Sequence, residues 1–80
     1  MPLLVVTIDI AFGELIRQSL EETGRYRVLI ACKADEAVSI VKTEKTPLAF
    51  LDTTYKANDA LDIGHALRDA NEKIQFIIIS

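Results

Sequence analysis

Hydrophobic and polar positions along this chain follow two different periods in turn. Four short apolar runs are typical of strands buried in a parallel sheet. They occupy residues 3–8, 26–30, 47–51 and 74–80. Between them, apolar residues recur at spacings of three and four, which is typical of helices with one buried side. These helices are predicted over residues 11–23, 35–45 and 58–71.

Local signals mark where these elements end. Gly24 follows the first helical segment, and glycine readily takes the left-handed conformation that ends a helix. Pro47 stops the second helix, because proline disfavours helical backbone at the residue before it. Tyr26, Val28 and Ile30 alternate with Arg27 and Leu29, so their strand is predicted to be partly solvated and at the sheet edge. The order β-α-β-α-β-α-β predicts an α/β domain with a parallel sheet and helices on both faces.

The apolar run that Pro47 introduces ends abruptly at Asp52, which two hydroxyl residues follow. In open α/β sheets, ligands bind just outside the carboxyl ends of the strands. Asp52 is therefore a candidate functional carboxylate. The alternative interpretation is that Asp52 caps the strand exit or the following helix, as aspartate often does.

Composition and charge narrow the function classes. Eighty residues allow one domain, over residues 1–80, and half of them are hydrophobic, so the chain is globular. A net charge of −3, with nine scattered basic residues, argues against nucleic acid or an anionic membrane as a partner. No apolar run is long enough to cross a bilayer, and no signal peptide is evident. The single cysteine, Cys32, excludes an internal disulfide and, with one histidine, a Cys/His zinc site, so a cytoplasmic protein is predicted.

Enzyme chemistry has weak support. A haloacid-dehalogenase-like loop would need a second acid two residues after Asp52, where Thr54 stands. Nucleotide binding would need a glycine-rich first turn, and Gly13 stands alone. His65 belongs to an acidic, solvated helix stripe, and Cys32 is interpreted as a small buried hydrophobe. We therefore predict that the chain is not an enzyme and has no catalytic residues.

Several short motifs occur in a fixed order along the chain. They are Ala11-Phe12-x-x-Leu15-Ile16, Gly24-x-Tyr26-x-Val28, Asp35-Glu36-Ala37, the run from Pro47 to Asp52, and Ile77-Ile78-Ile79-Ser80. Together with the hydrophobic first strand, this set resembles the response-regulator receiver domain of two-component signalling. The resemblance implies a flavodoxin-like, doubly wound sheet with strand order 2-1-3-4, incomplete because the chain is truncated after the fourth strand.

The resemblance also implies roles for single residues. Asp52 falls on the phospho-accepting aspartate, and Ser80 falls on the hydroxyl switch position. The acidic pair that holds magnesium falls on Thr7 and Ile8, neither of which supplies an anionic ligand. Only Asp9 and Asp52 are left to bind Mg²⁺, which prefers hard oxygen ligands, so any such site is expected to be weak.

Other departures from the receiver pattern bear on phosphorylation. Lys56 replaces the proline after the phosphorylation loop, although Asp59 keeps the acidic position that follows. The chain ends before the strand that carries the family's lysine. We therefore expect a degenerate receiver that acts through protein–protein contacts, with a histidine kinase or an output domain as a further partner. The alternative is a phosphorylatable receiver with Asp52 as the acceptor.

Topology predicts a surface for self-association. Because parallel crossovers are right-handed, the first helix lies on one face of the sheet and the other two helices lie on the opposite face. Strands three and four are then uncovered on the first helix's side, and the strand from Ile74 to Ser80 is an unpaired edge. Hydrophobic edges and large apolar patches invite association. We therefore predict a homodimer or higher oligomer that forms through this strand and the uncovered face.

Overall fold

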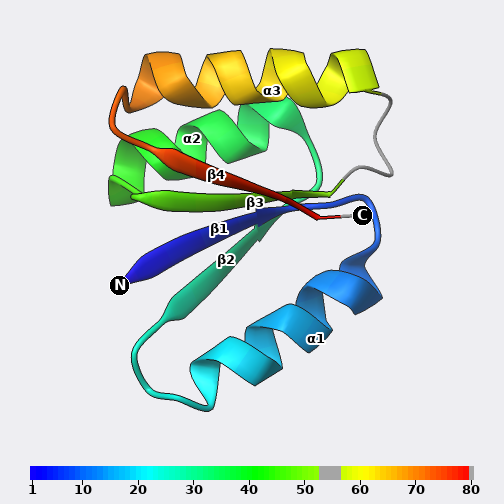
Figure 1. Cartoon of the computed structure of the whole chain (residues 1–80). Helices are drawn as coiled ribbons and strands as arrows, with labels where there is room; N and C mark the ends of the chain where they lie inside the picture. The colour runs from blue at the N-terminus through cyan, green and yellow to red at the C-terminus, as the bar shows by residue number, and fades with distance from the viewer. Residues whose placement is uncertain (53–56, 80) are drawn as a thin grey trace.

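Strands and helices alternate along the whole of the chain that is described (Figure 1). The computed structural model describes residues 1–52 and 57–79. In order, the elements are β1 (Pro2–Val6), α1 (Ile10–Glu21), β2 (Arg27–Ala31), α2 (Ala34–Glu44), β3 (Leu48–Asp52), α3 (Ala57–Ala70) and β4 (Gln75–Ile79). The predicted β-α-β-α-β-α-β order is confirmed.

The strands form one parallel sheet in the order β2-β1-β3-β4. β1 lies at its centre, with Leu4 beside Leu29 of β2 on one side and Ala49 of β3 on the other. β3 in turn pairs with β4, where Leu51 lies beside Ile78. The predicted strand order is confirmed, and β2 lies at a sheet edge, as its alternating pattern predicted.

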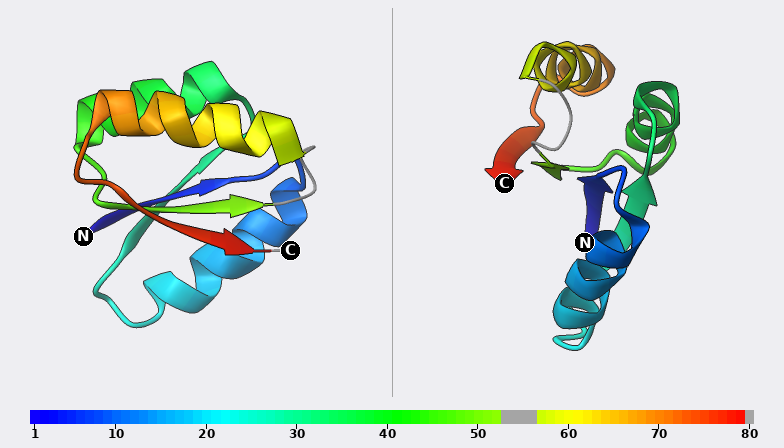
Figure 2. Two further views of the ribbon diagram at one scale, coloured as in Figure 1. Left: turned by 45° about the horizontal axis from the view of Figure 1, so that its top comes forward. Right: turned by 90° about the vertical axis from the view of Figure 1, so that its right-hand side faces the viewer.

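Helices cover both faces of the sheet, so the fold is doubly wound (Figure 2). α2 and α3 lie side by side on one face, and α1 lies alone on the other, as right-handed crossovers require. Because side chains alternate along a strand, β1 contributes to two cores. Leu4 and Val6 belong to the core under α2 and α3, whereas Leu3 and Val5 belong to the core under α1.

The turn between β1 and α1 begins earlier than the apolar pattern predicts. That pattern extends the strand to residue 8, but β1 ends at Val6. Asp9 then caps α1, because its carboxylate accepts a hydrogen bond from the amide of Phe12 at 3.1 Å. At the other end of α1, Gly24 has a φ of 73° and ends the helical turn, as predicted. The other boundaries differ from prediction by no more than two residues.

The helices are short. The longest, α3, has 14 residues. A helix that crosses a bilayer needs about 20 predominantly apolar residues. Within residues 1–52 and 57–79, no helix is long and apolar enough to span a membrane.

α1 covers only part of its face of the sheet. Leu48 and Phe50 of β3 are half-buried on that face, and Ile77 of β4, the register partner of Phe50, is exposed. Leu15, which the helical pattern assigns to the buried side of α1, is 63% exposed. The physical reason is that none of the described elements lies beside α1 over β3 and β4. The uncovered face that the crossovers predicted is thus confirmed.

The packing of α3 makes a testable prediction about stability. Leu67 is fully buried in the core under α2 and α3. We expect Leu67→Ala to lower the free energy of unfolding by about 2–5 kcal/mol, because it removes apolar contacts and leaves a cavity. Leu67→Met keeps the volume and should cost less than about 1.5 kcal/mol. Urea denaturation followed by circular dichroism measures both, and equal losses for the two variants would contradict the assigned packing.

Candidate functional site

Asp52 ends β3 at the carboxyl edge of the sheet, where the sequence predicts a functional carboxylate. Its side chain is only 2% exposed. Val6 and Leu51 are register partners on the adjacent strands β1 and β3, so the residues that follow them lie side by side. The hydroxyl of Thr7 donates a hydrogen bond to Oδ2 of Asp52 at 2.5 Å, and Thr7 is itself fully buried. A hydroxyl and a carboxylate therefore meet inside the protein.

Backbone contacts fix the hydroxyl of Thr7 in this position. The amide of Thr7 donates to the carbonyl of Ala31 on β2 at 3.0 Å. The Thr7 hydroxyl oxygen also accepts a hydrogen bond from the amide of Asp9 at 3.0 Å. Thr7 thus links the carboxylate of Asp52 to the turn that begins α1. A short hydrogen bond to a charged group is among the stronger ones in proteins.

The side chains available here do not fit a magnesium site. Asp9 lies at the same edge of the sheet, but its carboxylate is exposed and caps α1. Ile8 points its apolar side chain into solvent. Within the described residues, no group of three or more acidic, histidine or cysteine side chains could hold a metal ion. Because Mg²⁺ demands near-ideal octahedral oxygen coordination, these described side chains do not form a magnesium site.

No protein-family model matches the chain, and no curated protein matches it. Among solved structures, chemotaxis protein CheY4 of Vibrio cholerae matches with a TM-score of 0.83 and 16% identity, over 96% of this chain and 65% of its own. A response regulator protein of Burkholderia pseudomallei, solved with a phosphorylated aspartic acid, a calcium ion and citrate, also has a TM-score of 0.83. It is 23% identical, over 96% of this chain and 45% of its own.

A third match is the receiver domain of HemR from Leptospira biflexa, with a TM-score of 0.77 and 23% identity, over 96% of this chain and 61% of its own. The chain has the fold of a response-regulator receiver domain. Identities of 16–23% make this a likeness of fold. The chain spans less than two thirds of the length of these proteins.

Other residues of the receiver pattern lie apart from Asp52 or are not described. Ser80, Thr54 and Lys56 lie outside the described residues. His65 is exposed on α3, in keeping with the solvated stripe that the sequence predicts. Cys32, interpreted from the sequence as a buried hydrophobe, is half-buried just after β2.

Gly13 allows α1 of this receiver fold to approach Thr7 closely. A Cβ atom at Gly13 would lie 3.3 Å from Cγ2 of Thr7 and 3.2 Å from Cδ1 of Ile30, which is tighter than ordinary contact. Glycine inside a helix costs about 0.5–1 kcal/mol relative to alanine. The close packing of α1 against Thr7 explains why a glycine stands here in spite of that cost. Sequence reasoning missed this role, although an isolated glycine within a helical pattern is a signal of close packing.

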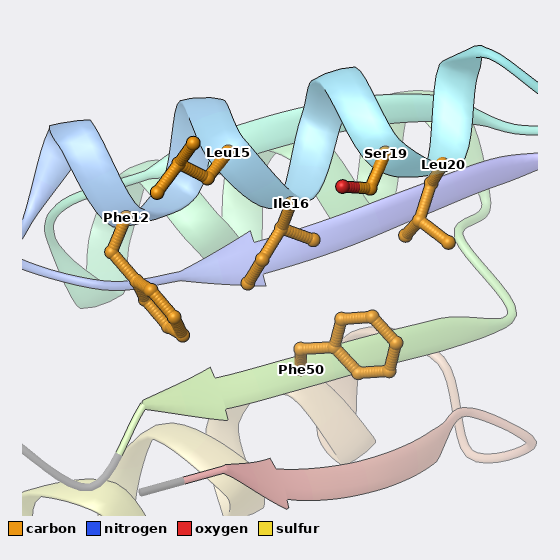
Figure 3. Close-up of a pocket in the computed structure, with 6 residues that line it drawn as sticks. All are labelled: Phe12, Leu15, Ile16, Ser19, Leu20 and Phe50. Atoms are coloured by element: carbon orange, nitrogen blue, oxygen red, sulfur yellow. The ribbon is translucent and has the colours of Figure 1, made fainter.

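A second feature of this structure is an apolar groove between α1 and β3 (Figure 3). Its volume is about 390 Å³. Phe50 rises from β3 toward the helix and closes one side. The lining side chains carry no charge and are Phe12, Leu15, Ile16, Ser19, Leu20 and Phe50.

The contact between Thr7 and Asp52 predicts a measurable coupling. In a double-mutant cycle of Thr7→Val and Asp52→Ala, we expect the two losses in unfolding free energy to fall short of additivity by about 1–3 kcal/mol. Thr7→Val also removes the hydrogen bond from the amide of Asp9 to Thr7. This loss occurs in both the single and the double variant, so it cancels in the cycle. Chemical denaturation measures the four free energies. Additive losses would mean that the two side chains do not interact.

Proposed function

We propose that this chain is a degenerate receiver module of two-component phosphorelay signalling. It acts through protein–protein contacts rather than as an enzyme, and Asp52 does not accept a phosphoryl group. The observation that carries this proposal is the hydrogen bond from Thr7 to the buried carboxylate of Asp52. The single cysteine, which leaves no internal disulfide, fits the cytoplasmic location that such a role implies.

Phosphoryl transfer depends on positioning and on neutralising charge around the transferring group. Asp52 is 2% exposed, and one of its oxygens is held by the neutral hydroxyl of Thr7. By the resemblance to receivers, the metal-binding acids would stand at Thr7 and Ile8. The side chain of Ile8 is apolar, and the hydroxyl of Thr7 is hydrogen-bonded to Asp52. These features support a carboxylate used for structure instead of phosphoryl chemistry.

A second candidate function is a phosphorylatable receiver with Asp52 as the acceptor. The observation that favours it is the position of Asp52 at the carboxyl end of β3, beside the end of β1. The Burkholderia pseudomallei response regulator, which has the same fold, was solved with a phosphorylated aspartic acid and a calcium ion. If the chain is a phosphorylatable receiver, Ser80 would serve as the switch hydroxyl, and Asp9 and Asp52 would bind Mg²⁺. The haloacid-dehalogenase alternative gains no support from the described residues.

Metal binding separates the two candidates. We expect the wild-type chain to bind Mg²⁺ weakly and to resist labelling by acetyl phosphate. Ile8→Asp should strengthen Mg²⁺ binding by about tenfold or more, because it supplies a carboxylate ligand near Asp52. Ile10→Asp is the matched control, since Ile8 and Ile10 are both 58% exposed. Amide shifts near Asp9 and Asp52 report the titration.

Two outcomes of this experiment would contradict the degenerate receiver. One is tight, saturable Mg²⁺ binding by the wild type at sub-millimolar metal. The other is rapid labelling of Asp52 by acetyl phosphate. Equal gains from Ile8→Asp and Ile10→Asp would mean that any added carboxylate attracts the metal, and would contradict the assigned ligand position.

The proposed partners are a second copy of this chain and, in the signalling pathway, a histidine kinase or an output domain. Self-association is supported by the open edge of β4 and by the uncovered face beside it, where Phe50 and Ile77 meet solvent. Apolar patches of more than a few hundred Å² are uncommon on monomers. The exposed side of α3, which carries Asp62, His65 and Asp69, is polar and is excluded from this interface.

Sedimentation tests self-association directly. We expect the wild-type chain to sediment as a dimer or higher oligomer at tens of micromolar, and to dissociate on dilution. Burial of apolar surface drives such association. Raising the salt concentration should not dissociate the assembly, because the groove lining carries no charge. A well-folded monomer at tens of micromolar would contradict self-association.

A further inference from the structure

β2 forms one edge of the sheet, and its bonds to β1 show which of its backbone groups point outward. The amide of Arg27 donates to the residue before β1 at 2.9 Å, and the carbonyl of Ala31 accepts from the residue after β1 at 3.0 Å. Bonding groups alternate between the two sides of a strand, so every second residue of β2 faces away from β1. We define the edge amides of β2 as those of Val28, Ile30 and Cys32.

Glutamate side chains bond to the first and the last of these edge amides. Oε1 of Glu21, the last residue of α1, accepts a hydrogen bond from the amide of Val28 at 3.2 Å. Oε1 of Glu36, in the first turn of α2, accepts from the amide of Cys32 at 3.4 Å. Because α1 and α2 lie on opposite faces of the sheet, the two carboxylates reach the edge from opposite sides (Figure 2). Only the amide of Ile30 is bonded to no side chain of the described residues.

The carboxylate of Glu21 is directed at the strand more closely than at the cation on its own helix. Its Oε1 lies 3.8 Å from Nε of Arg17, farther than from the amide of Val28. Arg17 donates instead to Glu14 at 2.9 Å, and this hydrogen bond raises the pKa of Arg17. The edge amide therefore explains where the Glu21 side chain lies.

A carboxylate oxygen on an edge amide occupies the place that an added strand needs. Neighbouring strands lie about 4.8 Å apart and are joined by carbonyl oxygens that accept from such amides. With Val28 and Cys32 already bonded, a single edge amide is left for an incoming strand. We propose that Glu21 and Glu36 close the β2 edge against strand addition. Closure of this edge depends neither on the phosphorelay role nor on self-association through β4.

The strand that these contacts exclude is β2 of a second copy. Two identical edges related by a two-fold axis run antiparallel, and each supplies amides and carbonyls to the other. Val28, Leu29 and Ile30, at the centre of β2, are apolar, and two of them are β-branched. Without the two glutamates, the edge would be an open apolar strand, which pairs readily with another copy.

Three double variants separate hydrogen bonding from charge. Glu21→Ala with Glu36→Ala removes both acceptors, whereas Glu21→Gln with Glu36→Gln removes the same two charges and keeps an acceptor oxygen at each position. Glu22→Ala with Glu72→Ala is the matched control. Both of these glutamates are exposed, and neither side chain is bonded to another group of the described residues. Circular dichroism verifies that each variant is folded.

Sedimentation equilibrium of the full chain measures the association of each variant. We expect the alanine pair at Glu21 and Glu36 to lower the dissociation constant for association by about tenfold or more relative to wild type. The glutamine pair and the Glu22/Glu72 control should stay within about threefold of wild type. Equal gains in all three variants would mean that lost charge drives association, and no gain in the alanine pair would mean that the edge is not closed by these contacts. Either result would overturn the inference.

Amide hydrogen exchange tests the contacts in the wild-type chain itself. We expect the amides of Val28 and Cys32 to exchange about tenfold or more slowly than the amide of Ile30, because only the first two are bonded to a carboxylate. Equal exchange at all three would contradict the inference without any substitution. A monomeric wild type would contradict the proposed self-association, whereas a gain in association by the alanine pair over that monomer would still support closure of the β2 edge.

Discussion

The structure depends on the burial of β1 between two neighbouring strands and two layers of helices. Its residues from Leu3 to Val6 are almost completely shielded from solvent, on both faces of the sheet. A shift of the strand by one residue would exchange the two cores, so the register is strongly specified. The same register brings Thr7 beside Asp52, because Val6 pairs with Leu51. The geometry of the site is therefore a consequence of how the core packs.

A buried carboxylate can be stabilised by a cation or by neutral hydrogen-bond donors. The hydroxyl of Thr7 satisfies one oxygen of Asp52 without adding charge. Close packing of Gly13 against Thr7 then fixes that hydroxyl between α1 and β3. These contacts hold the buried aspartate in place at the end of β3.

Sequence reasoning succeeded where the signal is local. Each strand is an apolar run bounded by a breaker such as Pro47, and each helix shows its own period, so element type and order could be predicted. The contact between Thr7 and Asp52 could not, because it joins residues 45 positions apart and depends on the register of β1 against β3. The exposure of Leu15 is a similar case. A helical period identifies the apolar side of α1, but not whether another element covers it.

The two faces of the molecule differ because of chain topology. Right-handed crossovers send α2 and α3 to one face and α1 to the other, so two helices share one side and a single helix lies on the other. The exposed side of α3 can remain in water, because His65 and its acidic neighbours are polar. The α1 side cannot shield Phe50 and Ile77 with one helix. The topological rule that orders the strands therefore also determines which face the described elements leave partly uncovered.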